Sequence, residues 1–250
     1  MVAIRIICGL CVFFVSTNLS TAQLLSRGES TRYPTSNAVI PTSSTTAPQT
    51  LIDFIEPNFK AEVSSVLQKP TLSTKHTEES FSANPVVYKW LLDHPDRTAL
   101  AWERLGVPCL PIREKAAQSY QYKDENTATE LNWQSVGTIP DGRVWLATGK
   151  VKPGALFPTV PVKVVAMIRH PIEKTLDGKT VVTPTVRIYF QTDSRAAATV
   201  MRLAGPAAPR MAEEGAEQLL FFFSGMARYL DKHPDQTATL LSPAKKTVTK

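Results

Sequence analysis

The chain is poor in cysteine. It has 3 cysteines among 250 residues, and Cys8 and Cys11 both lie in an apolar stretch near the N-terminus. Without that stretch only Cys109 remains, which excludes an internal disulfide. Cys109 lies between prolines in VPCLPI and is most simply a small buried apolar side chain. A catalytic thiolate paired with a distant histidine is the alternative.

Metal-binding and catalytic motifs are also missing. The 4 histidines are His76, His94, His170 and His233, and none shows the H-x-H or H-E-x-x-H spacing of a metal site. The chain contains no G-x-S-x-G elbow, phosphate-binding glycine loop or calcium loop, so we expect no metal and no cofactor. His170 is the histidine most suited to approach an acid in a cleft, although beside Pro171 it would also serve as a surface or capping residue.

The chain lacks a long apolar run after its N-terminus, and it lacks a basic cluster. Later segments fall short of the ~20 apolar residues that a membrane-spanning helix needs, so we expect no transmembrane segment in the mature chain. Lys and Arg number 28 against 22 Asp and Glu, a formal net charge of +6, but they are scattered apart from Lys245, Lys246 and Lys250. Nucleic-acid binding requires basic residues gathered on one face, so we expect no nucleic-acid partner.

The N-terminus predicts export. Arg5 precedes the apolar run IICGLCVFFV and the polar stretch STNLSTAQ, which is the order of regions in a secretory signal peptide. Ser20 and Ala22 are the small residues that cleavage requires. We therefore place the cut after Ala22 and the mature protein in the periplasm or the extracellular medium, with an uncleaved N-terminal anchor as the alternative.

Composition divides the rest of the chain into three parts. Residues 23–84 are rich in Ser, Thr and Pro, which predicts a flexible linker that carries a short helical piece around Val63 and Val66. Residues 85–235 have the regular apolar patterns of a single α+β domain. Residues 236–250 form a basic tail.

One pattern occurs twice in the chain, as LLDHPDRTALAW at residues 91–102 and LDKHPDQTATLL at residues 230–241. Proline suits the first turn of a helix, and aspartate is favoured near a helix N-terminus. Each copy is therefore predicted to end one helix and begin another, and the first copy predicts a helical pair that stops at Gly106. Convergence of two similar junctions and a remnant of duplication both explain the doubling.

Strand-like runs follow the helical pair and predict an antiparallel meander of about five strands. The runs are SYQYK, LNWQSV, RVWLATGKV, VKVVAMIRH and VRIYFQT. Asp177-Gly178 predicts a two-residue turn in the last hairpin. That turn places Met167 opposite Ile188 and Val165 opposite Phe190, on the face that we expect to meet the core.

Two prolines interrupt this hairpin. The same register sets Pro171 opposite Pro184, and neither residue can donate a ladder hydrogen bond. We therefore expect the pairing to weaken there and residues 172–183 to project from the sheet.

The chain after the strands is helical in pattern. Residues 194–205 form one such segment, and a longer helix is predicted from about residue 210 to residue 233. Its apolar stripe consists of Leu219, Phe222, Phe223, Met226 and Leu230. Phe221 lies off the stripe and either packs under a loop or marks a contact surface.

A helical pair, an antiparallel meander and a long terminal helix together resemble the helix-grip architecture of START and Bet v 1-like proteins, over about residues 85–235. The resemblance implies a sheet curled around the helix, with a cavity between them for an apolar small molecule. The chain also resembles exported bacterial proteins that combine a signal peptide, an HPD-containing helical opening, a run of strands and a terminal helix. That second likeness implies no activity.

Three functional hypotheses follow. The first is a noncatalytic exported protein that holds an apolar ligand between sheet and helix, with plain core packing as the alternative role of the lining. The candidate lining residues are Trp133, Trp145, Met167, Ile188, Phe190, Phe222, Phe223 and Met226. The second is an exported enzyme in which His170 or His94 hydrogen-bonds an acid in a pocket. The third is an envelope or surface interaction module that uses Phe221 or residues 152–161.

Export can be tested directly. When the full chain is produced in a bacterial host, we expect the exported protein to begin at Gln23, because the small residues Ser20 and Ala22 precede that position. N-terminal sequencing and intact mass measure the cut. Protein that retains Met1 in the membrane fraction would show an uncleaved anchor instead.

Overall fold

The computed structural model describes residues 48–109, 112–124, 128–152, 159–192 and 207–243. The predicted signal peptide, the helical segment predicted at residues 194–205 and the last seven residues of the predicted tail lie outside these ranges. Within the described part of the chain, no helix is both long and apolar enough to cross a membrane.

The main sheet is antiparallel throughout. It has seven strands in the order β1-β10-β7-β6-β5-β4-β3. Their bounds are β1 (Leu72–Thr77), β3 (Ile112–Ala116), β4 (Ser119–Asp124), β5 (Thr129–Ile139), β6 (Gly142–Val151), β7 (Val160–Arg169) and β10 (Thr185–Gln191). A second, three-stranded sheet joins β2 (Phe81–Ser82), β9 (Thr180–Val182) and β8 (Ile172–Lys174) in that order.

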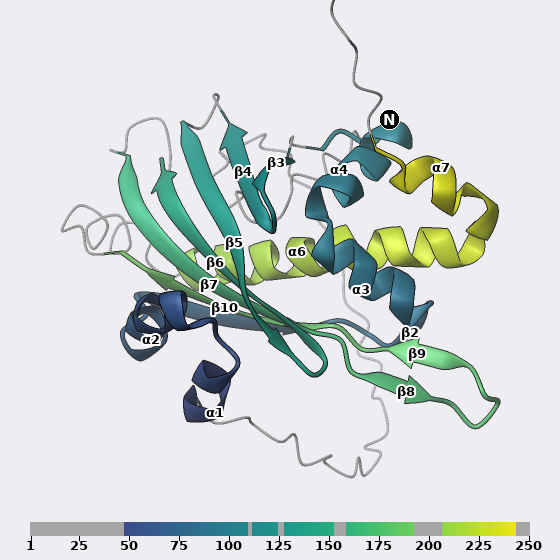
Figure 1. Cartoon of the computed structure of the whole chain (residues 1–250), viewed down its shortest axis with the longest axis horizontal. Coiled ribbons are helices and arrows are strands. Elements are labelled where there is room, and N and C mark those ends of the chain that lie inside the picture. The colour runs from purple at the N-terminus through teal and green to yellow at the C-terminus, as the bar shows by residue number, and fades with distance from the viewer. Residues whose placement is uncertain (1–47, 110–111, 125–127, 153–158, 193–206, 244–250) are drawn as a thin grey trace, which may run out of the picture.

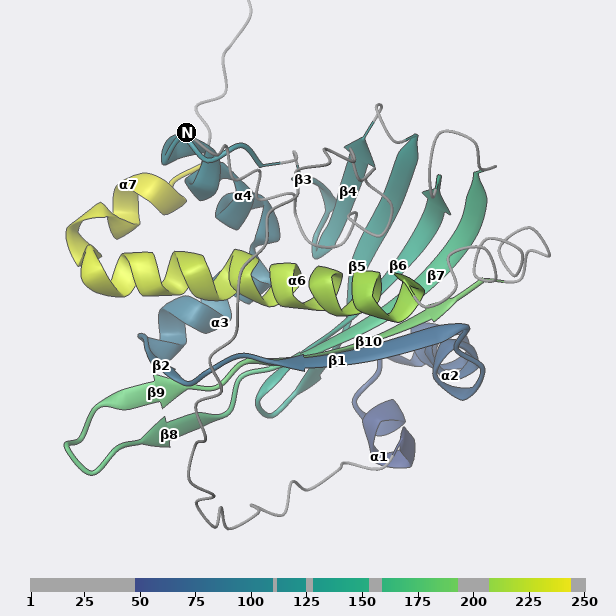
Figure 2. The same cartoon turned by 180° about the vertical axis from the view of Figure 1, so that it is seen from behind.

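Helices cover both faces of the main sheet. The long helix α6 (Ala207–Lys232) lies along one face, and the short helices α1 (Pro48–Asp53) and α2 (Lys60–Gln68) lie on the other side (Figure 1, Figure 2). The helical pair α3 (Pro85–Asp93) and α4 (Pro95–Arg104) packs beside α6. This arrangement confirms the predicted α+β fold, in which an antiparallel sheet packs on a long C-terminal helix and a helical pair precedes the meander. The main sheet has seven strands where about five were predicted, because β3 joins the meander and β1, which lies before the helical pair, pairs with β10.

Regular structure begins well before residue 85, where the sequence placed the start of the domain. The 3₁₀ turn η2 (Pro57–Phe59) leads into α2, which buries Val63 and Val66, and β1 pairs along its whole length with β10. Backbone hydrogen bonds hold β1, whose sequence LSTKHT is mostly polar and whose residues alternate between half-buried and exposed. The composition of β1 therefore does not predict a strand. Because α2 is packed in the core and β1 is paired with β10, residues 48–84 belong to the folded unit.

The sheet carries a separate apolar core on each of its faces. Ala166 and Ile168 belong to the core shared with α6, whereas Val165 and Leu146 belong to the core shared with α1 and α2. Consecutive residues of the central strands are thus buried on opposite sides. A sheet covered on both faces has apolar runs instead of the alternation of apolar and polar residues seen in one-sided sheets.

The pairing of β7 with β10 differs by one residue from the predicted register. Ile188 lies opposite Ala166, and Met167 lies opposite Arg187. Because a shift of one residue reverses the face of every side chain on a strand, Met167 packs in the α2-side core, away from α6. The predicted core face is wrong for β7 and is correct for Ile188 on β10.

The length of the connecting loop causes this shift. Lys174 pairs with Thr180, which leaves residues 175–179 as the loop in place of the predicted two-residue turn. The Thr175 amide donates to the Lys179 carbonyl at 2.9 Å, and Gly178 has a φ of +78°, a conformation that glycine adopts without strain. A loop with an odd number of residues moves the register by one position.

The prolines break the hairpin where the sequence predicts. The main ladder ends at the pair Arg169 and Thr185, and pairing resumes between β8 and β9 beyond Pro171 and Pro184. The β8–β9 hairpin extends away from the main sheet and pairs with β2 (Figure 1). The expected projection of residues 172–183 is therefore present.

Helix α6 presents its predicted stripe to the sheet. Leu219, Phe222, Phe223, Met226 and Leu230 are each at most 4% exposed. Phe221, on another side of the helix, is 45% exposed and stacks on the ring of Trp102 with a centroid distance of 6.1 Å.

Both copies of the doubled pattern form helix junctions, as predicted. His94 separates α3 from α4, and His233 separates α6 from the 3₁₀ turn η3 (Pro234–Gln236), which leads into α7 (Thr237–Leu241). The two histidines have nearly the same backbone angles, φ −132° and ψ 65° at His94 and φ −131° and ψ 62° at His233. Each ring also contacts the aromatic residue four positions earlier, at 4.2 Å from Trp90 and 4.5 Å from Tyr229.

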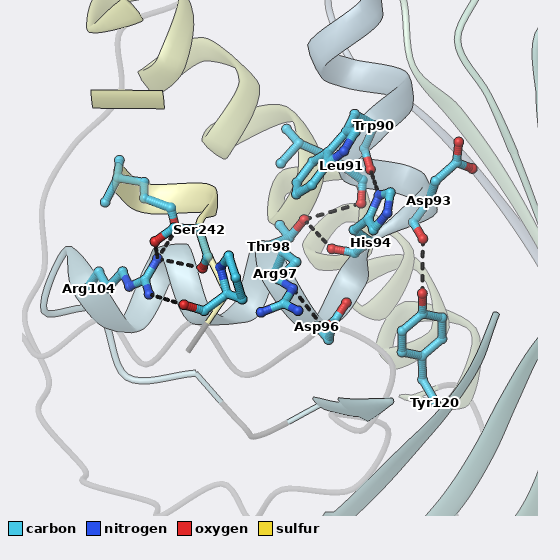
Figure 3. Close-up of polar contacts among 12 residues, drawn as sticks. Trp90, Leu91, Asp93, His94, Asp96, Arg97, Thr98, Arg104, Tyr120 and Ser242 are labelled. Atoms are coloured by element: carbon cyan, nitrogen blue, oxygen red, sulfur yellow. Dashed lines mark hydrogen bonds and ion pairs between the residues drawn. The ribbon is translucent and has the colours of Figure 1, made fainter. Parts of the chain in front are cut away.

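Side-chain hydrogen bonds stabilise the α3–α4 junction and join α4 to the segment after α6 (Figure 3). Thr98 Oγ1 donates to the carbonyls of Leu91 and His94 at 3.2 and 3.1 Å. Arg104, at the end of α4, donates to the carbonyls of Leu240 and Ser242 at 2.6 and 2.9 Å. The start of the predicted basic tail is therefore a helix held against α4.

Two neighbouring phenylalanines provide a matched test of this packing. We expect Phe222→Ala to lower the free energy of unfolding by about 3–5 kcal/mol, because the ring is 1% exposed and leaves a cavity between helix and sheet. The control Phe221→Ala removes the same atoms from a half-exposed site, and its cost should stay near 1 kcal/mol. Urea unfolding measures both. Equal losses would contradict the assigned orientation of α6.

Candidate functional site

An apolar cavity lies between the main sheet and α6. Strands β3 to β7 form one wall, α6 forms the other, and Pro95 at the start of α4 contributes to the lining. The lining residues are Pro95, Ile112, Tyr120, Tyr122, Trp133, Trp145, Ala166, Ile168, Leu219, Phe222 and Phe223. This is the space between sheet and helix in which the sequence predicts a ligand.

The cavity is small. Its volume is about 50 Å³, well below the roughly 300 Å³ expected of a pocket for a drug-sized ligand. One water molecule requires about 10–15 Å³, so the space is larger than an ordinary packing defect but accepts only a few heavy atoms as it stands. Most of the region between sheet and helix is filled by side chains, as plain core packing requires.

The aromatic side chains of the sheet wall are held in fixed positions. Tyr120 is 3% exposed, and its hydroxyl donates to the carbonyl of Asp93 at 2.9 Å, which ties β4 to the end of α3. Its ring lies 5.8 Å from that of Trp145 in a tilted contact. Burial, reinforced by the negative charges of Asp96, Glu114 and Asp93, raises the pKa of Tyr120, so its hydroxyl stays protonated as a donor.

The helix wall is held equally firmly. Trp102 Nε1 donates to the carbonyl of Phe222 at 2.9 Å, which fixes α6 against α4. Gly225 lies beside the same indole, and a Cβ at this position would come within 3.1 Å of Trp102. The rings of Phe222 and Phe223 meet edge to face at 4.8 Å.

The structure places four of the eight predicted ligand-binding residues in the cavity wall: Trp133, Trp145, Phe222 and Phe223. Ile188, Phe190 and Met226 belong to the same core without lining the cavity. Met167 lies against the other face of the sheet.

Several lining residues were not foreseen, and some had a signal in the sequence. Tyr120 and Tyr122 are two positions apart in SYQYK, so they share one face of a strand. Ala166 and Ile168 were assigned to the wrong face by the hairpin register. Pro95 and Ile112 reach the cavity through the packing of α4 and β3, which no local pattern reveals.

The arrangement expected of a His/acid enzyme is not found in the described part of the chain. His94 Nδ1 is 2.9 Å from the carbonyl of Trp90, and no described hydrogen bond joins a histidine or Cys109 to a carboxylate. Cys109 is partly buried against the α6-side core. The described residues contain no group of three or more His, Cys, Asp or Glu side chains that could hold a metal ion.

The surface-module hypothesis rested on Phe221 and residues 152–161. Phe221 is half exposed but contacts Trp102, and residues 153–158 lie outside the described ranges. Among the described residues, the other exposed large apolar side chains are dispersed: Phe54 follows α1, Val86 lies in α3, and Ile172 and Leu176 lie in the β8–β9 hairpin.

Comparison with known proteins adds little to this description. No family model and no curated protein sequence matches the chain. A conserved protein from Geobacillus kaustophilus is similar at 11% identity, with a TM-score of 0.39 over 62% of this chain and 96% of that one. Ara h 8.0201 matches at 12% identity and a TM-score of 0.29, over 59% and 99% of the two chains.

A third similar structure is the di-domain ARO/CYC BexL from the BE-7585A biosynthetic pathway. It shows 16% identity and a TM-score of 0.30, over 72% of this chain and 55% of that one. With TM-scores this low, the fold assignment rests on the strand order and helix placement described above.

Proposed function

We propose that this protein binds a small apolar molecule between the sheet and α6 and does not act on it chemically. The observation that supports the proposal is the lining: a cavity of about 50 Å³ whose wall is apolar and aromatic and whose position is fixed by buried hydrogen bonds. Apolar cavities of about 150 Å³ stay dry and take up benzene, so this space needs a modest expansion to hold a ring. We also propose export as the setting, on the basis of the N-terminal sequence.

The cavity size restricts the ligand class. A drug-sized or long-chain ligand would have to displace the side chains that now fill the core, at a cost of several kcal/mol. A single aromatic ring needs only a rotation of a lining side chain. Trp133 is the best placed to move, because it is only partly buried whereas Trp145 is 5% exposed. We therefore propose a ligand about the size of one ring.

Benzene and naphthalene test this proposal as ring probes of increasing size. We expect benzene to cause saturable shifts in the NMR signals of the Trp133 and Trp145 indoles, and naphthalene to cause none at the same concentration. If benzene causes no saturable shift, the cavity is ordinary core packing. If naphthalene binds equally well, the size limit is wrong.

Two neighbouring residues on β7 supply the matched variants. Ala166 lines the cavity, whereas Met167 packs on the opposite face of the sheet. Ala166→Val adds two methyl groups to the wall and should weaken benzene binding by at least about 10-fold. Met167→Leu changes a side chain of similar volume outside the cavity and should leave binding unchanged. Parallel urea unfolding shows whether each variant folds.

A further inference from the structure

A second pocket lies where the turn between β5 and β6 meets the end of β7, beside Lys89 of α3. Its volume is about 320 Å³, and its lining combines the cationic or titratable side chains Lys89, Arg143 and His170 with the apolar side chains of Phe54, Ile139 and Pro140. None of these residues lines the cavity beside α6. The pocket is therefore independent of the proposed apolar site.

His170 is buried beside this pocket, and its ring makes no hydrogen bond to a described residue. Its backbone amide donates to the carbonyl of Asp141 at 2.6 Å, and its ring packs 5.4 Å from that of Tyr88. The residue is 5% exposed, and its Nδ1 atom is buried without a hydrogen bond. No described residue hydrogen-bonds either nitrogen of the imidazole. A buried polar group in this state commonly marks a missing ligand or water molecule.

The charges around the pocket leave one cation unpaired. Arg143 binds the carboxylate of Asp93 through two hydrogen bonds, at 2.5 and 2.9 Å, and Arg169 binds Asp141 at 2.9 Å. Lys89 is exposed and has no carboxylate partner among the described residues. Its ammonium group is thus the charge available to an incoming anion.

We propose that this pocket binds a small organic carboxylate. The carboxylate lies between Lys89 and the imidazole of His170, which supplies an N–H donor. The apolar part of the ligand lies against Phe54, Ile139 and Pro140. An inorganic oxyanion would leave that apolar wall in contact with water, and a neutral molecule would gain nothing from the charge of Lys89.

Binding should also be linked to protonation of His170. Burial lowers the pKa of His170, and the positive charges of Arg143 and Lys89 lower it further. The negative charges of Asp141 and Asp93 act in the opposite direction. A bound carboxylate adds a negative charge next to the ring and favours its charged form. The pKa of His170 should therefore rise on binding, and affinity should increase as the pH falls through the pKa of the bound state towards the lower pKa of the free protein.

Benzoate, inorganic phosphate and benzyl alcohol are suitable probes. NMR titration of the His170 ring across pH 4–8 should show that benzoate raises its pKa and that the other two probes leave it unchanged. No shift with benzoate would overturn the proposal. An equal shift with phosphate would overturn the organic class, and an equal effect of benzyl alcohol would overturn the role of charge.

Lysine variants make the test independent of folding defects at the buried histidine. Lys89→Gln should weaken benzoate binding about 10-fold, and Lys89→Arg should retain most of it. Lys150→Gln, an exposed lysine at the far end of β6, is the matched control and should bind as the native protein does. A similar loss in Lys150→Gln would show that only the net charge matters.

Discussion

A sheet that is apolar on both faces must be covered on both faces, and most of this architecture follows from that constraint. Val165 and Ala166 are adjacent in β7 yet belong to different cores. Leaving either face in water would expose a row of aliphatic side chains, at a free-energy cost of about 25 cal/mol for each Å² of apolar surface. The chain meets the requirement with α6 on one side and with α1 and α2 on the other, and so its N-terminal helices are part of the fold.

The same constraint explains what could be predicted from the sequence. Helix α6 has one continuous apolar stripe, so Phe222, Phe223 and Met226 were placed in the core correctly from spacing alone. The central strands are apolar on both sides, so periodicity could not choose a face for Met167. The predicted face of Met167 therefore depended on the length of the hairpin turn. The loop contains residues 175–179 instead of two residues, and this difference places Met167 on the opposite face. Strand β1 was missed because its contribution lies in backbone pairing.

The candidate sites differ in how far the sequence reveals them. Of the eight ligand-binding residues predicted on the meander and on α6, four line the apolar cavity, and they make up four of its eleven lining residues. The pocket around His170 joins Phe54, Lys89 and Arg143, which are far apart in the chain and share no local pattern. The feature that marks this pocket is the buried Nδ1 atom of His170, which has no hydrogen-bond partner among the described residues. Burial of this kind follows from three-dimensional packing and leaves no pattern in the sequence.

The projecting β8–β9 hairpin has a practical consequence. Its ladder is separated from the main sheet by Pro171 and Pro184, and the Leu176 side chain at its end is fully exposed. Exposed loop tips accept inserted sequence at little energetic cost. An epitope or a fluorescent label introduced between Leu176 and Gly178 would therefore report on the protein without touching either core or either pocket.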